Sequence, residues 1–527
     1  WVPSLGYIHS TCTAKGLVAM SDTPEFSTSR RQVLTAAGGL AGLSLLGAGT
    51  RSAFAADTTW DVIVIGGGTA GLPTALFAAE RGRVLVVEKG PILGGTLDRS
   101  TGQVAAAGTV FQQAKNIADN PDAHYDDIMR INQGSSDPAL TRVFVDNAAS
   151  ALNWLASNGY TVEPDHPVTG QGHEHFKIAR YQWGPKGGWT IFETLQPLVQ
   201  QATDSGRLQV MLNSSAVELM QDQSGAVTGV TVADETGALR DLRARQVVLA
   251  SGGCASNPAM FEELHGVPLY CQIAHPNSQG AGLTLGLGAG GYIRGGDKYA
   301  ALVGAIMASD SYPSPGSGFS SLNPTLRQPW EILVNSNGER FVQEDHPSID
   351  HIEHLVAQQP GHRHWAIFDQ QILDTAPPLV DGWTAQQVEE ACDTHPMFSR
   401  ADTLGQLAVK AGVNPRKLTA TVEAYNDARD RETADPMGLE HRPLPIARPP
   451  YYAVRMQGWT LISFAGLGVD DQLRVTAEDG RPIPNLYAVG EVIGAGATSG
   501  KAYTNGMLVT PALTFGKLLG ESILDIA

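Results

Sequence analysis

The alternation of apolar runs with small or polar residues predicts a strand, a helix and a second strand early in the chain. The run "DVIVI", from Asp61 to Ile65, is apolar after its first residue and predicts a buried strand. A helical pattern follows from about Leu72 to Glu80, and "RVLVVE" predicts the next strand. Together these elements predict one βαβ unit, the building block of a parallel sheet.

The turn inside this unit carries glycines at an informative spacing. Gly66, Gly68 and Gly71 follow the first strand in a GxGxxG pattern, and Glu88 ends the second strand. Such glycines let the backbone approach a pyrophosphate, which the N-terminus of the following helix stabilises. An acid about 20 residues further on accepts hydrogen bonds from ribose hydroxyls. The complete combination predicts binding of an adenine dinucleotide.

Three further patterns place elements along the rest of the chain. "QVVLASGGCASNP" predicts a strand that ends in a turn of small residues at Ala250 to Gly253. "LYAVG" predicts another strand just before Glu491. Between them, "EILVNSNGERFVQED" predicts two strands around a glycine turn, and residues 403–430 have a helical pattern.

Length, charge and cysteine content narrow the class of protein. A chain of 527 residues exceeds the roughly 250–300 residues of a single core, so we expect at least two domains. The formal net charge of -17 argues against nucleic-acid and anionic-membrane partners, because phosphate binding needs clustered Lys and Arg. The four cysteines form no CxxC, haem or iron–sulfur spacing. Redox chemistry would therefore need a non-covalent organic cofactor or an external partner.

Residues 1–55 have the pattern of a leader. "SRRQVLTAAGGLAGLSLLGAG" sets Arg30 and Arg31 before a glycine-rich apolar run, and Ala53 and Ala55 are small residues suited to cleavage. The segment resembles a twin-arginine export signal, which implies a periplasmic or secreted protein without a transmembrane segment in the mature chain. We expect translation to start at Met20, so that residues 1–19 are not translated. A buried N-terminal helix is the alternative, although the five glycines of the run disfavour it.

From about Trp60 to the C-terminus, the chain resembles the fumarate reductase and succinate dehydrogenase flavoprotein family, which includes the 3-ketosteroid dehydrogenases. The pieces that match are the GxGxxG unit, the glycine loop in "KGPILGGTLDRSTGQ", "LASGG" and "LYAVGEV". The resemblance implies FAD and an α/β fold, in which a Rossmann-like FAD-binding domain is split by an inserted α+β capping domain. The first FAD-binding part would span residues 56–274, the capping domain 275–449 and the second FAD-binding part 450–527.

The resemblance also implies which residues contact FAD. The residues for the ADP half are Gly66, Gly68, Thr69, Ala70, Gly71, Glu88 and Lys89, with Ala216 on the adenine side and Ser251 and Gly252 near the dinucleotide. The residues toward the flavin are Gly95, Thr96, Leu97, Gly102, Gly490, Glu491, Leu508 and Val509. "TLDRSTGQ" lacks the histidine that attaches flavin covalently in membrane-bound members, so we expect non-covalent FAD. Ala281 stands where the family has an aspartate, which removes one polar contact.

Three basic positions of the fumarate-type members are neutral in this chain. The arginine expected eight residues after the arginine of "GERF" falls on Ser348, and the family's histidine falls near Ile462 and Ser463. The last arginine falls on Tyr503. Because these cations bind substrate carboxylates, their loss disfavours a dicarboxylate substrate. A charge supplied from elsewhere, by Arg455, Lys501 or Arg180, stays open.

The segment "YTNGM" resembles instead the ketosteroid dehydrogenase branch, where a tyrosine hydroxyl and a glycine amide lie near the substrate ketone. Donors aimed at a carbonyl oxygen stabilise the enolate that forms when the neighbouring carbon loses a proton. The expected catalytic residues are Tyr503, as acid or base, and Gly506. Ser348 stands where that branch has a second tyrosine, and Arg180 is expected near the flavin edge or a substrate oxygen. Flavin N5 would exchange the hydride.

A replacement for the missing second tyrosine is expected in "QEDHPSIDHIEH". The candidate bases are Asp345, His346, Asp350 and His351. The alternative is that these are solvated polar residues of a loop.

No metal is expected. The pairs His173 and His175, and His351 and His354, have spacings that a metal could use, but the sequence indicates no third ligand.

The leading hypothesis is an FAD-dependent oxidoreductase acting on CH–CH groups. It would dehydrogenate a small apolar ketone at its α,β bond or reduce the corresponding enone, with a quinone or a carrier protein as electron partner. The sequence leaves the direction of the reaction open. One alternative is a fumarate- or urocanate-type reductase of a conjugated carboxylic acid. Another is a flavin-carrying binding protein without turnover.

Overall fold

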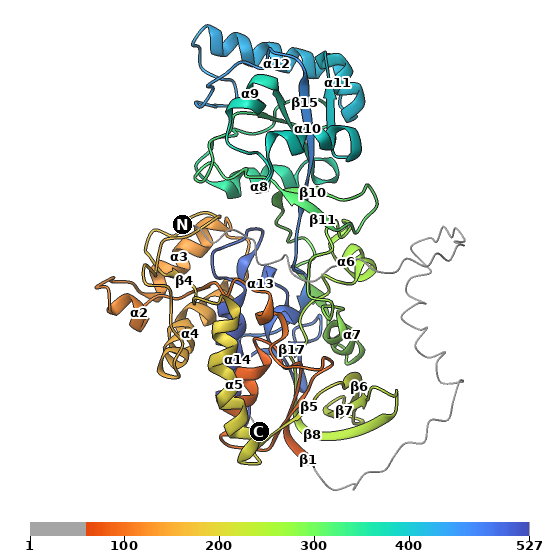
Figure 1. Ribbon diagram of the computed structural model, residues 1–527. Helices are drawn as coiled ribbons and strands as arrows, with labels where there is room; N and C mark the ends of the chain where they lie inside the picture. Colours follow the sequence, from red (N-terminus) through yellow and green to blue (C-terminus); the bar gives the residue numbers. More distant parts are fainter. Residues whose placement is uncertain (1–58, 526–527) are drawn as a thin grey trace, which may run out of the picture.

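The computed structural model describes residues 59–525, which form two bodies arranged end to end (Figure 1). The leader expected over residues 1–55 lies outside these residues. The larger body contains both ends of the described chain, and the smaller body, the cap, is built mainly from Ala301 to Trp459. The predicted fold, a split α/β domain with an inserted cap, is confirmed. No helix of residues 59–525 is long and apolar enough to cross a membrane.

A mixed sheet forms the centre of the larger body. Its parallel strands are β18 (Pro482–Ala488), β8 (Leu239–Leu249), β1 (Thr59–Ile65), β2 (Val84–Val87) and β5 (Leu208–Met211), in this spatial order. The antiparallel strands β17 (Arg474–Thr476), β6 (Ser215–Gln221) and β7 (Val227–Ala233) extend it. Val62, Ile63 and Val64 of β1 are completely buried. A strand covered on both faces needs such a continuous apolar run, which explains why "DVIVI" predicted it.

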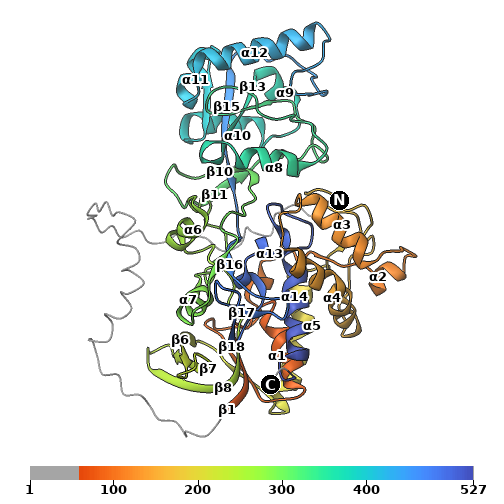
Figure 2. The same cartoon turned by 180° about the vertical axis from the view of Figure 1, so that it is seen from behind.

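Helices cover both sides of this sheet. On one side, α1 (Gly71–Ala79) packs on β1 and β2 and against α5 (Gly188–Asp204) and α14 (Val509–Ser522), and α14 packs on α4 (Pro138–Ser157). On the other side α7 (Ala281–Gly288) packs on β6, and α6 (Pro258–His265) lies between α7 and the cap (Figure 2). The remaining elements of this body are α2 (Val110–Gln113), α3 (Pro121–Ile131), α13 (Gly496–Ser499), β3 (Val104–Ala105), β4 (Tyr181–Gln182), β9 (Ile293–Arg294) and β16 (Gly466–Leu467).

The cap contains an antiparallel sheet with helices around it. Its strands are β10 (Leu302–Met307), β11 (Gly316–Phe319), β12 (Ile332–Val334), β13 (Arg363–Asp369), β14 (Phe398–Ala401) and β15 (Tyr451–Trp459). Its helices are α8 (Ile349–Ala357), α9 (Gln370–Thr375), α10 (Ala385–Thr394), α11 (Leu404–Ala411) and α12 (Pro415–Asp430). Residues 403–430 are helical as predicted, but they form two helices because Gly412 ends α11 in the left-handed conformation.

The structure shifts both predicted boundaries of the cap. β15 was assigned to the second FAD-binding part, yet it pairs with β10, β13 and β14 of the cap sheet. At the other boundary, α7 was assigned to the cap, yet its Leu283 and Leu285 are buried in the core of the larger body. Strand pairing and core packing therefore place the insertion later in the chain than the resemblance had implied.

Candidate active site

The carboxyl ends of the parallel strands meet at one edge of the large sheet. At this edge β1 leads to Gly66, β2 to Glu88, β8 to Ser251 and β18 to Gly490. Ligands of open α/β sheets bind outside this edge. The fold thus brings together residues that the sequence assigned separately to one dinucleotide.

Two of the fingerprint glycines are needed by the protein itself, whereas a third leaves space. A Cβ on Gly66, where φ is +107°, would collide with the Ala250 carbonyl oxygen, and one on Gly71 would collide with the Gly66 carbonyl oxygen. A Cβ on Gly68 would meet nothing nearer than the Gly95 Cα at 3.7 Å. Gly68 therefore packs against the second glycine loop without a steric need for glycine within the protein, and its missing side chain suits the close approach of a pyrophosphate to this turn.

Glu88 is fixed at the strand edge by backbone hydrogen bonds. Its carboxylate accepts from the amide of Gly67 at 2.8 Å and from the amide of Gly90 at 2.7 Å. The Ser214 amide donates to the Glu88 carbonyl at 2.9 Å, which brings the start of β6 and Ala216 toward Glu88. Because each carboxylate oxygen keeps acceptor capacity for a hydroxyl, these residues fit the adenosine half of FAD.

The residues predicted to face the flavin lie in the turns next to this edge. In the 3₁₀ turn Gly95–Asp98, Thr96 is exposed and Leu97 is buried. A Cβ on Gly102 would collide with the backbone of Gly187, so glycine is needed there for packing. Leu508, which precedes α14, is 37% exposed. An exposed leucine beside glycine-rich turns fits a ring system lying against it.

Glu491 is half-buried and receives hydrogen bonds from the segment that replaces the family's histidine. The amide and the hydroxyl of Ser463 donate to Glu491 Oε1 at 2.8 Å and 2.9 Å. Burial raises the pKa of Glu491, while the Ser463 hydrogen bonds oppose this shift. Gly490 lies against α1, since a Cβ there would be 2.9 Å from the Ala70 Cβ. The glycine turn after β1 and the turn after β18 therefore lie in contact, as residues that bind one shared ligand must.

Tyr503 lies at the junction of the two bodies. It forms a small buried apolar cluster with Ala300, Ile462, Phe464 and Ala495. Its hydroxyl is hydrogen-bonded to Thr460 Oγ1. Burial raises the pKa of Tyr503, and the hydrogen bond with Thr460 only partly opposes this shift. The phenol is therefore protonated at neutral pH, which favours a hydrogen-bond donor or acid over the base that the sequence left open.

Gly506 is held against β3 by close backbone contact. Its φ is +75°, and a Cβ there would lie 2.6 Å from the Ala105 amide nitrogen. The Thr510 hydroxyl donates to the Gly506 carbonyl at 2.8 Å and accepts from the Ala105 amide at 2.9 Å. Next to it, the buried atoms Thr504 Oγ1 and Asn505 Oδ1 lack a hydrogen-bond partner within residues 59–525. Such unpaired polar atoms fit a ligand that binds at this segment.

Ser348 immediately precedes α8, and its side chain makes no capping hydrogen bond. The candidate bases around it differ in their surroundings. Asp345 accepts hydrogen bonds from two backbone amides of the cap, which gives it a structural role. The rings of His346 and His351 stack on each other, with centroids 4.2 Å apart. Asp350 is the candidate that reaches out of the cap, because its carboxylate contacts His173 of the larger body.

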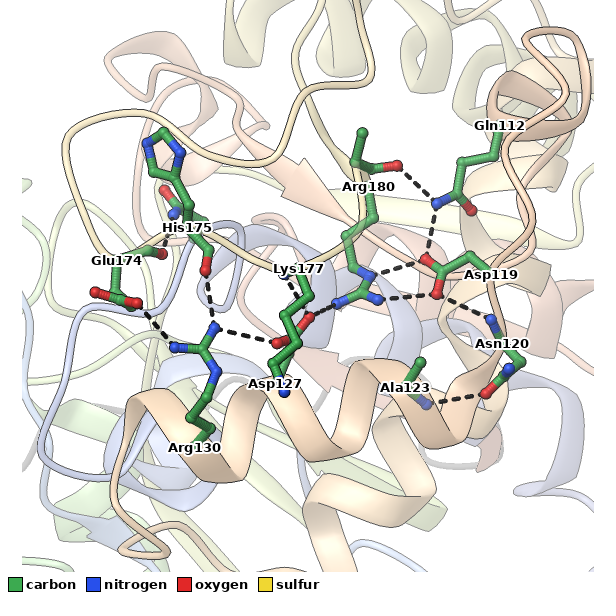
Figure 3. A network of polar contacts seen from close by, with 12 residues as sticks. Gln112, Asp119, Asn120, Ala123, Asp127, Arg130, Glu174, His175, Lys177 and Arg180 are labelled. Atoms are coloured by element: carbon green, nitrogen blue, oxygen red, sulfur yellow. Dashed lines mark hydrogen bonds and ion pairs between the residues drawn. The ribbon is translucent and has the colours of Figure 1, made fainter. Parts of the chain in front are cut away.

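The prediction that Arg180 contacts the flavin edge or a substrate oxygen is wrong. Its guanidinium is fully buried and donates to Asp119 twice at 2.8 Å and to Asp127 at 2.7 Å (Figure 3). The Gln112 amide also donates to Asp119, at 2.8 Å. These ion pairs neutralise the charge of Arg180 within the protein. Arg180 therefore anchors the segment before β4 to α3 and to the loop that precedes α3.

A cluster that the sequence did not identify lies beside Tyr503. His173 Nδ1 is 3.3 Å from Asp350 Oδ1 and 3.5 Å from Glu353 Oε2, and the His173 ring stacks on Tyr503 with centroids 5.5 Å apart. Among the His, Cys, Asp and Glu side chains of residues 59–525, these three are the ones close enough together to hold a metal ion. Asp350 and Glu353 share one face of α8 because they are three residues apart, a spacing visible in "DHIE". Their pairing with His173 was not visible.

Parallel strand ends that present glycine turns and a ribose-type carboxylate, in a domain with an inserted cap, are typical of dinucleotide-dependent oxidoreductases. The sequence pattern of the FAD binding domain family matches residues 61–503, and the chain belongs to this family. It therefore binds FAD and is an FAD-dependent oxidoreductase, as the sequence predicted.

Relatives lie in both branches suggested by the sequence. The chain is 26% identical over 476 residues to a fumarate reductase (cytochrome) of Shewanella frigidimarina, covering 89% of this chain and 78% of the relative. It is 26% identical over 572 residues to a 3-oxosteroid 1-dehydrogenase of Mycobacterium tuberculosis, covering 89% of this chain and 99% of the relative. The fold is similar to that of 3-ketosteroid delta1-dehydrogenase from Sterolibacterium denitrificans, with a TM-score of 0.68, 21% identity and coverage of 89% and 100%.

Proposed function

We propose that this flavoprotein dehydrogenates a neutral, largely apolar ketone at its α,β bond, or reduces the corresponding enone. The observation that supports this best is the environment of Tyr503, a protonated phenol that packs against apolar residues and the His173 ring, with no arginine among these neighbours. Asp350 and Glu353 are the acidic side chains that contact His173 beside it. These two acids balance the positive charge of His173, so the cluster supplies no unpaired cation for a substrate carboxylate.

The three cations considered as substitutes for the missing arginines have partners elsewhere. Arg180 is consumed by two buried aspartates, and Arg455 is paired with Asp310. Lys501 is the most available of the three, since it is 48% exposed and lies 3.7 Å from an aspartate. A dicarboxylate needs several desolvated cations to replace its hydration, and this set does not supply them.

The side chains near Tyr503 suit a carbonyl substrate. The Tyr503 hydroxyl and the Gly506 amide are the donors proposed for the carbonyl oxygen, where they would stabilise an enolate. FAD, when bound, supplies hydride acceptance or donation. The apolar residues Ile462 and Phe464 pack around Tyr503 and exclude water from the phenol.

Stopped-flow spectroscopy of the FAD-loaded protein tests the proposal. The oxidised enzyme is mixed with cyclic ketones and steroids, and the reduced enzyme with the matching enones, with fumarate and urocanate as comparison acceptors. We expect flavin reduction by a ketone or rapid reoxidation by an enone. Flavin that no ketone reduces and no enone reoxidises, but that fumarate reoxidises rapidly, would reject this function.

Reduction of a conjugated carboxylic acid is the second candidate, favoured by the similarity to the fumarate reductase. It would need Lys501 as a carboxylate partner, because the other candidate cations are paired. Lys501→Met should then abolish reoxidation by the acid without affecting FAD content. For a neutral ketone or enone the same variant should react within about twofold of the wild-type rate.

We also propose export by the twin-arginine route and electron exchange with a quinone or a carrier protein. Arg30 and Arg31 of the leader support the route. Replacing both by lysine should leave the protein in the cytoplasm, which fractionation of expressing cells measures.

The proposed electron partner has a test of its own. Membranes that contain quinone, but not quinone-depleted membranes, should support turnover of the FAD-loaded protein.

A further inference from the structure

The loop of residues 169–177 joins the cap to the last segment of the larger body. On the cap side, the Glu174 amide donates to Asp350 Oδ2 at 3.2 Å. On the other side, Asn505 Nδ2 donates to the Glu174 carbonyl at 2.8 Å. His173 is therefore held between α8 and the segment that carries Tyr503, at the place where the proposed substrate meets both bodies.

His173 has two different ring nitrogens in this position. Nδ1 faces Asp350 and Glu353, at 3.3 Å and 3.5 Å. Nε2 has no hydrogen bond to any other residue in the described part of the chain, and the side chain is 23% exposed. Nδ1 is thus tethered by carboxylates whereas Nε2 is available, the arrangement by which a carboxylate orients a catalytic histidine.

We propose that His173 is the acid–base residue of the reaction, exchanging a proton through Nε2 with the substrate carbon next to the carbonyl. Asp350 and Glu353 are positioning residues that stabilise the imidazolium. This inference rests on the proposed function, and it assigns to a histidine of the larger body the task for which Ser348 has no suitable group.

The step balances in both directions. In enone reduction, the Nε2 proton would add to the α carbon as the C=C bond becomes single, and FAD in its reduced form would supply the hydride for the β carbon. Solvent would then reprotonate the imidazole, whose side chain is 23% exposed. In ketone dehydrogenation, a neutral Nε2 would take the α proton, and oxidised FAD would supply the hydride acceptor.

The groups facing His173 make it a proton donor at neutral pH. Burial lowers the pKa of His173, but the charges and hydrogen bonds of Glu353 and Asp350 outweigh burial and raise it. Burial also raises the pKa of Glu353. From the other element, Tyr503 contributes a neutral phenol. In its own loop, Glu174 pairs with Arg130, and His175 is hydrogen-bonded to Thr169.

The two other ionisable side chains of α8 have partners elsewhere: His351 stacks on His346, and His354 Nε2 is 3.0 Å from the Lys501 carbonyl. The protonated state of His173 below its raised pKa suits enone reduction. The rate of proton donation should therefore be constant at neutral pH and fall as the pH rises through that pKa.

The test uses FAD-loaded protein and the enone that reoxidises it fastest. His173→Asn keeps a polar group near the position of Nδ1 but lacks Nε2, and His175→Asn is the same change two residues away in the same loop. We expect His173→Asn to slow reoxidation by about 10²-fold or more and to remove the fall at high pH. His175→Asn should retain both the rate and the pH profile.

Glu353→Gln tests the positioning role. Loss of that carboxylate lowers the pKa of the imidazole, so the high-pH fall should move to lower pH. An independent readout is ¹⁵N NMR of histidine-labelled, FAD-loaded protein without substrate, with the His173 signal assigned by its absence in His173→Asn. We expect both ring nitrogens of His173 to be protonated at pH 7.5, and the titration to move to lower pH in Glu353→Gln.

Three outcomes overturn the inference while leaving the proposed function intact. They are wild-type enone reduction with an unchanged profile in His173→Asn, a neutral His173 imidazole at pH 7.5, and a stoichiometric divalent metal that is lost in His173→Asn. An enzyme that is inert toward every enone and ketone overturns the proposed function, and the inference with it.

Discussion

Replacing Arg180 by methionine separates a structural role of this residue from a catalytic one. The change removes the guanidinium but keeps an unbranched side chain of moderate length. Three hydrogen bonds of 2.7–2.8 Å are lost, and Asp119 and Asp127 stay behind with side chains that are 0% and 2% exposed. Breaking a buried pair in this way costs about 3–5 kcal/mol, which is roughly two to four powers of ten in the folding equilibrium.

Urea denaturation of the FAD-loaded protein, followed by circular dichroism at a fixed excess of FAD, measures the loss. We expect a lower urea midpoint, while the folded fraction keeps its flavin and reacts in a single turnover within about threefold of wild type. Arg130→Met is the matched control, because Arg130 also binds Asp127, at 3.1 Å, but is 35% exposed. Its cost should stay below about 1 kcal/mol.

Neutralising the partners provides a second check on the mechanism. Adding Asp119→Asn and Asp127→Asn to Arg180→Met should recover part of the stability, since no unpaired buried charge remains. An Arg180→Met protein with a wild-type urea midpoint and no turnover would refute this reasoning and restore the catalytic interpretation.

Three further predictions address the donor, the cofactor turn and the response to acid. Tyr503→Phe should lower the single-turnover rate with the ketone or enone by about 10²–10³-fold, because it removes one hydrogen-bond donor to the substrate carbonyl. It should change the free energy of unfolding by no more than about 1.5 kcal/mol. An unchanged rate would mean that the phenol has only a packing role. Gly68→Ala should fold normally, because its Cβ would make only an ordinary contact with the Gly95 Cα at 3.7 Å. It should nevertheless weaken FAD binding by about 10-fold or more, measured as the flavin-to-protein ratio after dialysis, because the added methyl group would crowd a pyrophosphate bound at this turn. Gly71→Ala should instead lose folded protein, since its Cβ collides with backbone; equal flavin loss and equal stability in the two variants would contradict this division. His364 is buried without hydrogen-bond partners in the described chain, and burial lowers its pKa to about 3, so it stays neutral in the folded state while the unfolded chain takes up a proton near pH 6.5. Stability should therefore fall as the pH drops below 6.5, and between pH 7 and pH 5 the wild type should lose about 2 kcal/mol more than His364→Leu in urea titrations, whereas parallel losses would exclude this histidine as the cause.

The cofactor end was predictable because its determinants are local. The strand, glycine turn, helix and second strand follow one another within about 30 residues. Local backbone geometry therefore places the glycine turn at the carboxyl end of the first strand, next to the end of the second strand. The later cofactor segments were found through resemblance, and the parallel sheet brings them to the same edge.

The cap and the acid–base residues were less predictable for the opposite reason. β15 belongs to the cap because of its pairing with β13, which no local pattern of "YYAVRMQGW" specifies. Arg180 was predicted to bind substrate or flavin because no acidic partner for its charge could be recognised from the sequence. Its partners Asp119 and Asp127 are 61 and 53 residues away.

The sequence by itself determined that this chain builds a dinucleotide-binding sheet, and its resemblance to the family predicted that the basic residues for a dicarboxylate are missing. Only the tertiary structure decided which charges meet. His173 lies 177 residues from Asp350, so their contact depends on how the cap helix α8 packs over the larger body. Short motifs are fixed by backbone geometry, whereas the pairing of buried charges is fixed by long-range packing, and this packing gives Tyr503 its neighbours.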